Sequence, residues 1–347
     1  MGPVRTTLST SLLILLSLTF LAAQALAAQA APSGDAAFNT QLEEGKQALK
    51  AGKYKDAINA LKKANKLQNN SCGECYLLLA VAHYRSGELE QCEENCDKAV
   101  ATATDDGLRS LAHNMKGTAV LTATKKTDSK KAQESESEFR AAIGLDPKSA
   151  VFHLNLAKAL LRESKDDEAK QELQACLGLH LDEKQASEAR LLLGDPRRGR
   201  EEFAPEFEVS TLQGQTVSLK QLAGRVVVMD FWATWCPPCR ASVPELKELT
   251  RKYPTEKLVL ISVSADQDDR AWKEFVAKKK MDWAQYRDVD HKILDMFGIH
   301  SFPTYLVIDG DGIIKERLTG LNPQQSVVAR LRSTLGEMPQ LEGEAHK

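Results

Sequence analysis

Two thiols stand three residues apart in the segment Cys236-Pro237-Pro238-Cys239. An apolar run, Val226 to Phe231, predicts a buried strand directly before them, and the sequence after them predicts a helix to about Lys252. A thiol in the first turn of a helix meets unpaired backbone N–H groups and the positive end of the helix dipole, and both favour the thiolate. We therefore predict that Cys236 is the nucleophile of a thiol–disulfide exchange and that Cys239 resolves the mixed disulfide.

One charged residue, Asp230, interrupts the apolar run. A carboxyl group buried in such a strand loses its hydration, which raises its pKa and lets it act as a base near neutral pH. We predict that Asp230 is a proton acceptor; the alternative is a structural carboxylate that local hydrogen bonds satisfy. The rings of Pro237 and Pro238 restrict the loop. Because proline has no N–H group, these residues also withhold hydrogen-bond donors from the thiolate.

The elements that must position these residues alternate between strands and helices. A second buried strand is expected at Lys257–Val263, and the turn Asp309–Gly312 predicts a hairpin. The other expected elements are strands at 206–209, 216–219, 304–309 and 313–318, and helices at 269–280, 291–297 and 323–335. Such alternation predicts an α/β domain, which we place at residues 203–338, followed by a tail at 339–347.

Three stretches of this domain resemble the thioredoxin superfamily. Phe231–Cys239 (FWATWCPPC) and Phe302–Thr304 (FPT) resemble the superfamily as a whole, and Ala204–Phe207 (APEF) resembles its periplasmic TlpA/ResA branch. The resemblance covers about residues 203–336 and implies a thioredoxin-like α/β fold with a mixed central sheet. It also implies that Asp230 lies beneath the cysteines and helps Cys239 lose its proton.

The same resemblance assigns further residues. Pro303 corresponds to the superfamily's cis-proline, and Phe302 before it would offer backbone hydrogen bonds to an extended substrate. We name Trp235, Pro237 and Phe302 as candidate substrate contacts, although packing is the simplest role for Trp235. TlpA/ResA-type proteins often carry an acidic residue three positions after the second cysteine, where this chain has Ser242. The contribution of that carboxylate therefore does not carry over.

The resemblance implies an exported, periplasmic thiol–disulfide oxidoreductase of the protein-disulfide reductase type, which keeps targets such as cytochrome c apoprotein thiols reduced. Its partners would be protein disulfides or thiols and a thiol electron donor, for which a membrane-bound protein is a candidate. No cofactor is expected, and no metal, because the histidines show neither zinc nor haem spacing. The alternative is an interaction scaffold whose redox pair switches its binding. A peroxidase of the peroxiredoxin type is disfavoured, because the Pro-x-x-x-Thr-x-x-Cys context of that family is missing.

The first residues predict a secretory signal peptide. Arg5 precedes an apolar run from Leu12 to Leu21, and small residues at Ala25 and Ala27 suit a peptidase, so residues 1–27 are expected to be removed. The run is short for a membrane span of ~20 residues, and an uncleaved N-terminal anchor is the alternative. An exported protein would be soluble in an oxidising compartment, where disulfides persist.

Small residues recur through the N-terminal half at Gly45, Ala80, Gly117 and Ala157, where two helices are expected to approach closely. The units start near Phe38, Gly73, Ser110, Ala150 and Lys184. This pattern resembles the tetratricopeptide repeat (TPR), a helical hairpin of ~34 residues. The resemblance covers residues 38–193, with a polar insertion at 124–130 and a single capping helix at 184–193, and residues 194–202 are expected to form a linker.

Stacked repeats of this kind form a superhelix with a concave face, which could hold a peptide or protein partner. The residues expected on that face are Leu42, Lys46, Leu49, Lys50, Leu77, Tyr84, Arg85, Lys158 and Arg162. They would make an apolar groove with basic edges for an acidic or C-terminal segment. The alternative is that these lysines and arginines are solvated side chains on a scaffold.

Four further cysteines, Cys72, Cys75, Cys92 and Cys96, cluster in the second repeat. Structural disulfides are our first interpretation, and antiparallel helix packing would bring Cys75 close to Cys96. A zinc site and a second redox pair that exchanges with Cys236 are the alternatives. Cys176 occupies a small-residue packing position and is expected to be an inert buried thiol.

The overall composition narrows the class of partner. Apolar residues make up 42% of the chain and charged residues 27%, as in ordinary globular proteins, and the formal net charge is −2. This charge balance argues against nucleic acid or an anionic membrane surface as the main partner.

Overall fold

The structure is a computed structural model that describes residues 33–123, 129–320, 327–338 and 341. The chain divides between Arg200 and Glu201 into two compact units, each described here by itself. The expected signal peptide at 1–27, most of the insertion at 124–130 and most of the tail at 339–347 lie outside the described residues. Within the described ranges, no helix combines the length and the apolar character that a membrane span needs.

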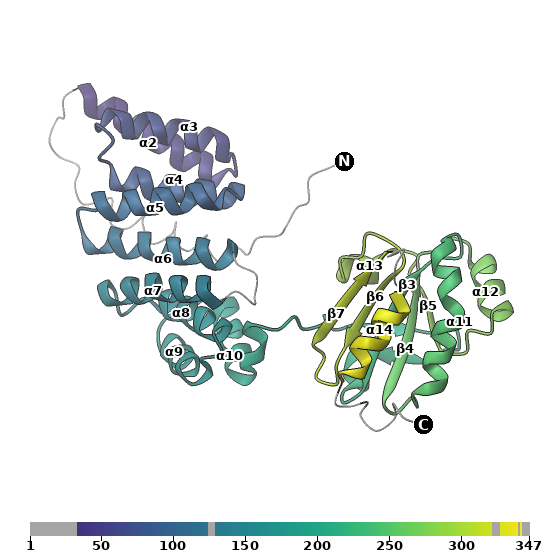
Figure 1. Cartoon of the computed structure of the whole chain (residues 1–347). Helices are drawn as coiled ribbons and strands as arrows, with labels where there is room; N and C mark the ends of the chain where they lie inside the picture. The colour runs from purple at the N-terminus through teal and green to yellow at the C-terminus, as the bar shows by residue number, and fades with distance from the viewer. Residues whose placement is uncertain (1–32, 124–128, 321–326, 339–340, 342–347) are drawn as a thin grey trace. The chain divides into compact units, whose positions relative to one another are not determined.

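The first unit consists of helices that pack in consecutive pairs (Figure 1). The pairs are α2 (Ser33–Lys50) with α3 (Tyr54–Leu67), α4 (Gly73–Ser86) with α5 (Leu89–Thr102), α6 (Asp106–Ala123) with α7 (Ser129–Leu145), and α8 (Ala150–Arg162) with α9 (Asp166–Gly178). A single helix, α10 (Glu183–Gly194), follows the last pair. The predicted array of helical hairpins with a capping helix is therefore confirmed.

Close helix contacts occur at the predicted small residues. A Cβ atom on Gly45 would lie 2.6 Å from Leu61 Cγ, and one on Gly117 would lie 2.8 Å from the Phe139 ring. Ala80 and Ala157 are fully buried. A larger side chain at any of these positions would force the paired helices apart.

The residues expected to form a linker are in part folded onto the repeats. Pro196–Gly199 form the 3-10 helix η2, which Asp195 caps through its side chain. A Cβ atom on Gly199 would lie 2.5 Å from Leu161 Cβ, and the Arg200 guanidinium pairs with Asp166 at 2.6 Å. The glycine, proline and charges that suggested a linker instead make a tight turn against α8, so the helical unit extends to Arg200.

The second unit is built on a five-stranded mixed sheet with the order β5-β4-β3-β6-β7 (Figure 1). Its strands are β3 (Val226–Trp232), β4 (Leu258–Ser264), β5 (Ala284–Arg287), β6 (Thr304–Ile308) and β7 (Ile314–Thr319). β3, β4 and β5 are parallel, whereas β6 runs antiparallel to both β3 and β7. The predicted mixed sheet is confirmed, but β5 was not predicted, because its four residues, AQYR, are too few to show a strand pattern.

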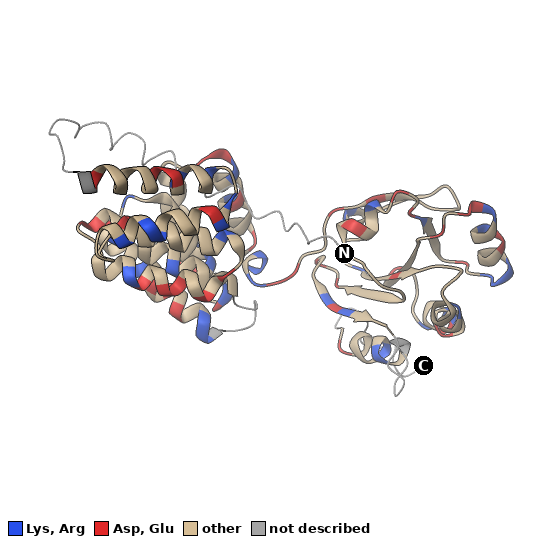
Figure 2. Ribbon diagram, turned by 90° about the horizontal axis from the view of Figure 1, so that it is seen from above, with Lys and Arg blue, Asp and Glu red and all other residues tan. Residues whose placement is uncertain are grey.

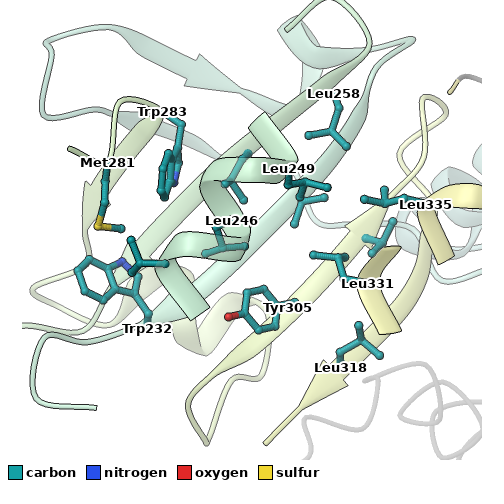
Figure 3. Packing of buried hydrophobic residues seen from close by; sticks show 14 of the residues in the cluster. Trp232, Leu246, Leu249, Leu258, Met281, Trp283, Tyr305, Leu318, Leu331 and Leu335 are labelled. Carbon is teal, nitrogen blue, oxygen red and sulfur yellow. The ribbon is translucent and has the colours of Figure 1, made fainter. Parts of the chain in front are cut away.

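Helices cover both faces of this sheet. α11 (Pro237–Lys252), α12 (Asp269–Lys278) and α14 (Val327–Gly336) share one core with the even-numbered residues of β3, and Figure 3 shows Leu246 and Leu249 of α11 in that core with Trp232 and Tyr305. The other face packs against α13 (Lys292–Met296), η3 (Leu219–Leu222) and the hairpin of β1 (Glu208–Ser210) and β2 (Thr216–Ser218). Since side chains alternate along a strand, Asp230 belongs to the face that α11 covers.

Candidate active site

The cysteines of the CPPC segment form a disulfide at the start of α11, with an S–S distance of 2.01 Å. Cys236 is the N-cap residue, and its Sγ accepts a hydrogen bond from the backbone N–H of Cys239 at 3.3 Å. Pro237 takes the first helical position, where a missing N–H costs nothing. Pro237 and Pro238 have no N–H group, so the donor that the first turn of α11 offers to Cys236 Sγ is the N–H of Cys239, which stabilises a thiolate once the pair is reduced.

Asp230 is almost fully buried on the sheet face below α11. Its Oδ2 accepts a hydrogen bond from Ser262 Oγ at 2.7 Å, and Ser262 Oγ in turn accepts one from Trp283 Nε1 at 2.8 Å. No described residue bonds to Asp230 Oδ1. Burial raises the pKa of Asp230 to about 7, and the Ser262 hydrogen bond opposes the rise only in part.

A carboxyl group with this pKa exchanges a proton near neutral pH. Tyr305, which pairs with Asp230 across β3 and β6, stays neutral there, because burial and the nearby Asp230 charge raise the pKa of its phenol. Asp230 is therefore the group below α11 that can take a proton from a cysteine thiol. That it serves Cys239 in turnover remains a prediction.

The loop before β6 carries the predicted substrate contacts. The peptide bond between Phe302 and Pro303 is cis. Gly320 N–H donates to the Pro303 carbonyl at 3.0 Å, while no described residue bonds to the Phe302 backbone. The Phe302 ring meets Trp235 edge-on, with 5.8 Å between ring centroids. Backbone groups beside the disulfide are thus available to an extended chain.

Trp235 does not pack into the domain, contrary to the simplest expectation from the sequence. Its side chain is 62% exposed, whereas Trp232 is buried and stacks on Phe275 with 5.5 Å between ring centroids. Trp232 belongs to the central strand β3, all of whose residues are buried, but Trp235 follows the end of the strand and stands at the surface. Exposure of so large an aromatic side chain beside the cysteines suits a substrate contact.

Sequence reasoning missed a buried carboxylate that holds the loop before Cys236. Asp266 accepts hydrogen bonds from Thr234 N–H at 2.9 Å and Thr234 Oγ1 at 2.6 Å, and a third from Ser264 Oγ at 2.6 Å. Thr234 and Asp266 follow the ends of the parallel neighbours β3 and β4. Polar residues after neighbouring parallel strands meet at one sheet edge, and this signal could have identified the pair.

Comparisons with known proteins agree with this geometry. A model of the AhpC/TSA family matches residues 201–317, and a tetratricopeptide-repeat model matches residues 48–112. Thiol-disulfide oxidoreductase ResA of Bacillus thuringiensis (strain Al Hakam) is 34% identical over 129 residues, which cover 37% of this chain and 75% of that protein. The chain belongs to the ResA family of thiol–disulfide oxidoreductases.

Two further relatives extend the comparison. The thioredoxin-like protein YneN of Bacillus subtilis (strain 168) is 31% identical over 135 residues, 37% of this chain and 76% of that protein. The crystal structure of a putative thiol:disulfide interchange protein DsbE from Chlorobium tepidum is 27% identical, covers 39% of this chain and 94% of that chain, and has a TM-score of 0.36. The ResA relatives, more than the family model alone, identify the activity as thiol–disulfide exchange.

Within this ResA-type site, Ser242 stands where many relatives were expected to carry an acid. Its hydroxyl donates to the Pro238 carbonyl at 3.2 Å, one turn back along α11. The Ser242 side chain therefore bonds to the first turn of its own helix, and no acidic side chain stands at this position of α11.

The cysteines of the helical unit differ from our first interpretation. Cys72 and Cys75 form a disulfide with an S–S distance of 2.10 Å, whereas Cys92 and Cys96 are free, buried thiols. Of the pairings that were left open, the structure forms only Cys72–Cys75, within the first turn of α4, so Cys75 is not bonded to Cys96. Nor do the described residues gather three or more metal-ligating side chains anywhere, so the zinc alternative lacks a site.

The three free thiols, Cys92, Cys96 and Cys176, are buried. A hydrogen bond with Cys92, one turn away on α5, and burial raise the pKa of Cys96 far above its usual range. Burial raises the pKa of Cys176 to about 11, and its Sγ donates to the Leu173 carbonyl at 3.1 Å. The predicted burial of Cys176 is confirmed, and its inertness stays a prediction.

The expected groove of the repeats is less open and less basic than predicted. Leu42 and Leu49 are buried in the helical core. Lys46 pairs with Glu74 of the next repeat, and Lys158 pairs with Glu188, both with N–O distances of 2.9 Å. Figure 2 shows acidic and basic residues interspersed over the helices, so the alternative of a scaffold with paired, solvated charges describes these lysines better.

Proposed function

We propose that this ResA-type oxidoreductase is exported and reduces protein disulfides, and that its helical repeats recruit a protein partner. The observation that carries the proposal is the helix-capping Cys236–Cys239 pair above a buried Asp230 whose pKa is about 7. The tetratricopeptide repeats support recruitment of a partner. The apolar N-terminal segment, which lies outside the described residues, supports export.

In the reduced protein, the Cys236 thiolate attacks a substrate disulfide and forms a mixed disulfide, releasing one substrate thiolate. Asp230 takes the proton of Cys239, whose thiolate then attacks Cys236 Sγ. The second substrate sulfur leaves as a thiolate and takes up the proton that Asp230 accepted, so that Asp230 is again a carboxylate. Two electrons have passed to the substrate, and Cys236 and Cys239 are again the disulfide seen in the structure. A thiol donor must then reduce this disulfide for the next turnover.

The reduction potential of the Cys236–Cys239 pair tests the direction. Both cysteines lie on one tryptic peptide, Val226–Arg240, so alkylation and mass spectrometry of protein equilibrated in dithiothreitol buffers measure this pair alone. We expect a value near ~−270 mV, as in thioredoxin. A value near ~−120 mV, as in the oxidant DsbA, would contradict the reductive role.

Substrate trapping tests the role of each cysteine. In a Cys239→Ala variant the mixed disulfide cannot be resolved, so covalent adducts should accumulate on Cys236. Adducts found only on Cys72 or Cys75 would show that the nucleophile is misassigned. If the unmodified protein failed to reduce insulin with dithiothreitol and released a repeat-bound partner on oxidation, the redox-switched scaffold would be the better description.

Export is tested by expressing the full chain in a bacterium that has a periplasm. We expect the periplasmic fraction to contain a protein whose N-terminus is Ala28, as cleavage after Ala27 requires. Recovery of the uncleaved chain in the membrane fraction would favour the N-terminal anchor, and recovery in the cytoplasm would contradict export.

A further inference from the structure

A second Cys-x-x-Cys disulfide, Cys72–Cys75, caps a helix in the unit that lacks the thioredoxin-like fold. Cys72 is the N-cap residue of α4, and its Sγ accepts a hydrogen bond from Cys75 N–H at 3.0 Å. The same bond joins Cys239 N–H to Cys236 Sγ in α11. Each outer sulfur therefore accepts a hydrogen bond from an N–H in the first turn of a helix, a setting that stabilises a thiolate.

Access to the two sulfurs of this pair is unequal. Cys72 is partly exposed, whereas Cys75 is fully buried between α2, α3 and α4. A thiol from outside can therefore reach Cys72, while Cys75 is shielded. This difference in access suits an exchange in which Cys72 is attacked and Cys75 is the resolving cysteine.

The loop that holds Cys72 is fixed independently of the disulfide. Cys72 N–H donates to the side chain of Asn65 at 3.1 Å, and the Tyr76 hydroxyl donates to the Asn70 carbonyl at 3.1 Å. Glu74, between the cysteines, would oppose a thiolate by its charge, but it pairs with Lys46 of α2 at 2.9 Å. The cap thus keeps its geometry when the disulfide opens.

The disulfide itself contributes little to holding the helices together. Its cysteines are three positions apart in one turn of one helix, so it joins no separate elements. The stabilisation that a disulfide provides by restricting the unfolded chain grows with the length of the loop it closes, and this loop is very short. A purely structural role therefore explains the pair poorly.

We propose that Cys72 and Cys75 form a second exchangeable redox pair, reduced by thioredoxin-type dithiols such as the Cys236–Cys239 dithiol of another copy of this chain. One donor thiolate attacks Cys72 Sγ, the Cys72–Cys75 bond breaks, and Cys75 leaves as a thiolate that takes up a proton. The second donor thiol then attacks the mixed disulfide and frees the Cys72 thiolate, which is also protonated. The donor loses two electrons and two protons and becomes a disulfide.

The test mixes two full-length variants. Oxidised Cys236→Ser/Cys239→Ser protein, which keeps only the helical pair, is incubated with a molar excess of reduced Cys72→Ser/Cys75→Ser protein. After acid quenching and alkylation, mass spectrometry reads the pair on the single tryptic peptide Leu67–Arg85. We expect this peptide to gain two alkyl groups within minutes, and the Val226–Arg240 peptide of the donor to lose the same number.

Other results would overturn the proposal. A peptide that stays oxidised in the folded protein with the donor variant and with dithiothreitol, and is reduced only in guanidinium chloride, would show a buried structural disulfide. If dithiothreitol reduced the pair and the donor variant did not, a thioredoxin-type donor would be excluded. A Cys72→Ala/Cys75→Ala variant separates the structural role further, because we expect its Tm to fall by a few degrees at most, whereas a structural bond predicts a large drop. None of these outcomes depends on whether Cys236–Cys239 works reductively in the cell.

Discussion

The helical unit and the α/β unit both place a Cys-x-x-Cys disulfide on the N-cap of a helix, but they surround it differently. Below α11 lies Asp230, a buried carboxyl group whose pKa is raised to about 7. Around the cap of α4 lie the side chain of Asn65 and the ion pair of Lys46 with Glu74. The surroundings of α11 therefore supply a group that can accept a proton, whereas those of α4 supply contacts that hold the Cys72 loop in place.

This difference separates what spacing determines from what the fold determines. Two cysteines three apart at a helix start give the same capped disulfide in both units. Whether the pair turns over quickly depends on a proton acceptor and on backbone groups for the substrate, and both lie outside the motif, on β3 and in the loop before β6. We therefore expect the α/β pair to reduce general substrates and the helical pair to exchange with dedicated dithiols.

The largest expected effect concerns the nucleophile. Cys236→Ser should lower insulin reduction by more than about a thousandfold, because loss of a nucleophile removes the covalent route. Cys176→Ala, which alters a buried thiol outside both pairs, is the matched control and should retain the rate. If Cys72→Ser lowered the rate as much as Cys236→Ser, general reduction would run through both pairs and the contrast between the units would fail.

The next effect concerns the proton acceptor. The pKa of Asp230 rises from 3.8 to about 7 on folding, so the folded state holds a proton that the unfolded state releases. The contribution of Asp230 to stability is therefore greatest below about pH 4, falls as the pH rises to about 7 and is constant above, with a total loss on the order of 4 kcal/mol. Asp230→Asn should regain that amount at pH 8 in urea unfolding and slow disulfide reduction on the order of a hundredfold.

A second variant at this site sharpens the same contrast. The Ser262 hydrogen bond lowers the pKa of Asp230, so Ser262→Ala should move the pH profile of disulfide reduction to higher pH. A profile that neither variant shifts would show that Asp230 is only a structural carboxyl group.

A smaller effect is expected from the loop before Cys236. Asp266→Ala leaves Thr234 N–H without its partner and should cost about 2–3 kcal/mol, whereas Thr234→Val removes only the hydroxyl bond and should cost about 1 kcal/mol. Urea unfolding followed by near-ultraviolet circular dichroism measures both. If Asp266→Ala lowered stability without slowing disulfide reduction, Asp266 would not position Cys236.

The smallest effect tests helix packing in the other unit. Gly117→Ala should destabilise it by about 1–3 kcal/mol, because the added Cβ would meet the Phe139 ring. Gly144→Ala is the matched control: that Cβ has open space on α7, so the variant should gain about 0.5–1 kcal/mol. Far-ultraviolet circular dichroism during thermal unfolding compares them, and equal effects would contradict the packing argument.

Much of the architecture could be predicted because it depends on local patterns. Small residues such as Gly45 and Gly117 mark close helix contacts, and the apolar run of β3 marks a central strand. The short edge strand β5 escaped prediction because the neighbouring strand β4, more than its own sequence, makes it a strand. Residues 194–202 were misjudged because turn-forming residues suit a linker and a packed 3-10 turn equally well.

In the candidate site, too, local patterns could be read from the sequence, whereas contacts between distant segments could not. The roles of Cys236 and Asp230 could be inferred from position on a helix start and a buried strand. The contact of Thr234 with Asp266 depends on which strands are neighbours, and the disulfide partner of Cys75 depended on a choice between its own helix turn and a facing helix. Sequence spacing alone decides neither question.

The exposed indole of Trp235 has a practical consequence. It directly precedes Cys236 in the chain and meets the Phe302 ring edge-on, while the other tryptophans, Trp232, Trp272 and Trp283, are buried in the same unit. Since a neighbouring disulfide quenches indole fluorescence, emission should rise when Cys236–Cys239 is reduced and fall when it is oxidised. The fluorescence intensity of Trp235 therefore reports the oxidation state of Cys236–Cys239, and a Trp235→Phe variant should lose this redox-dependent change in emission.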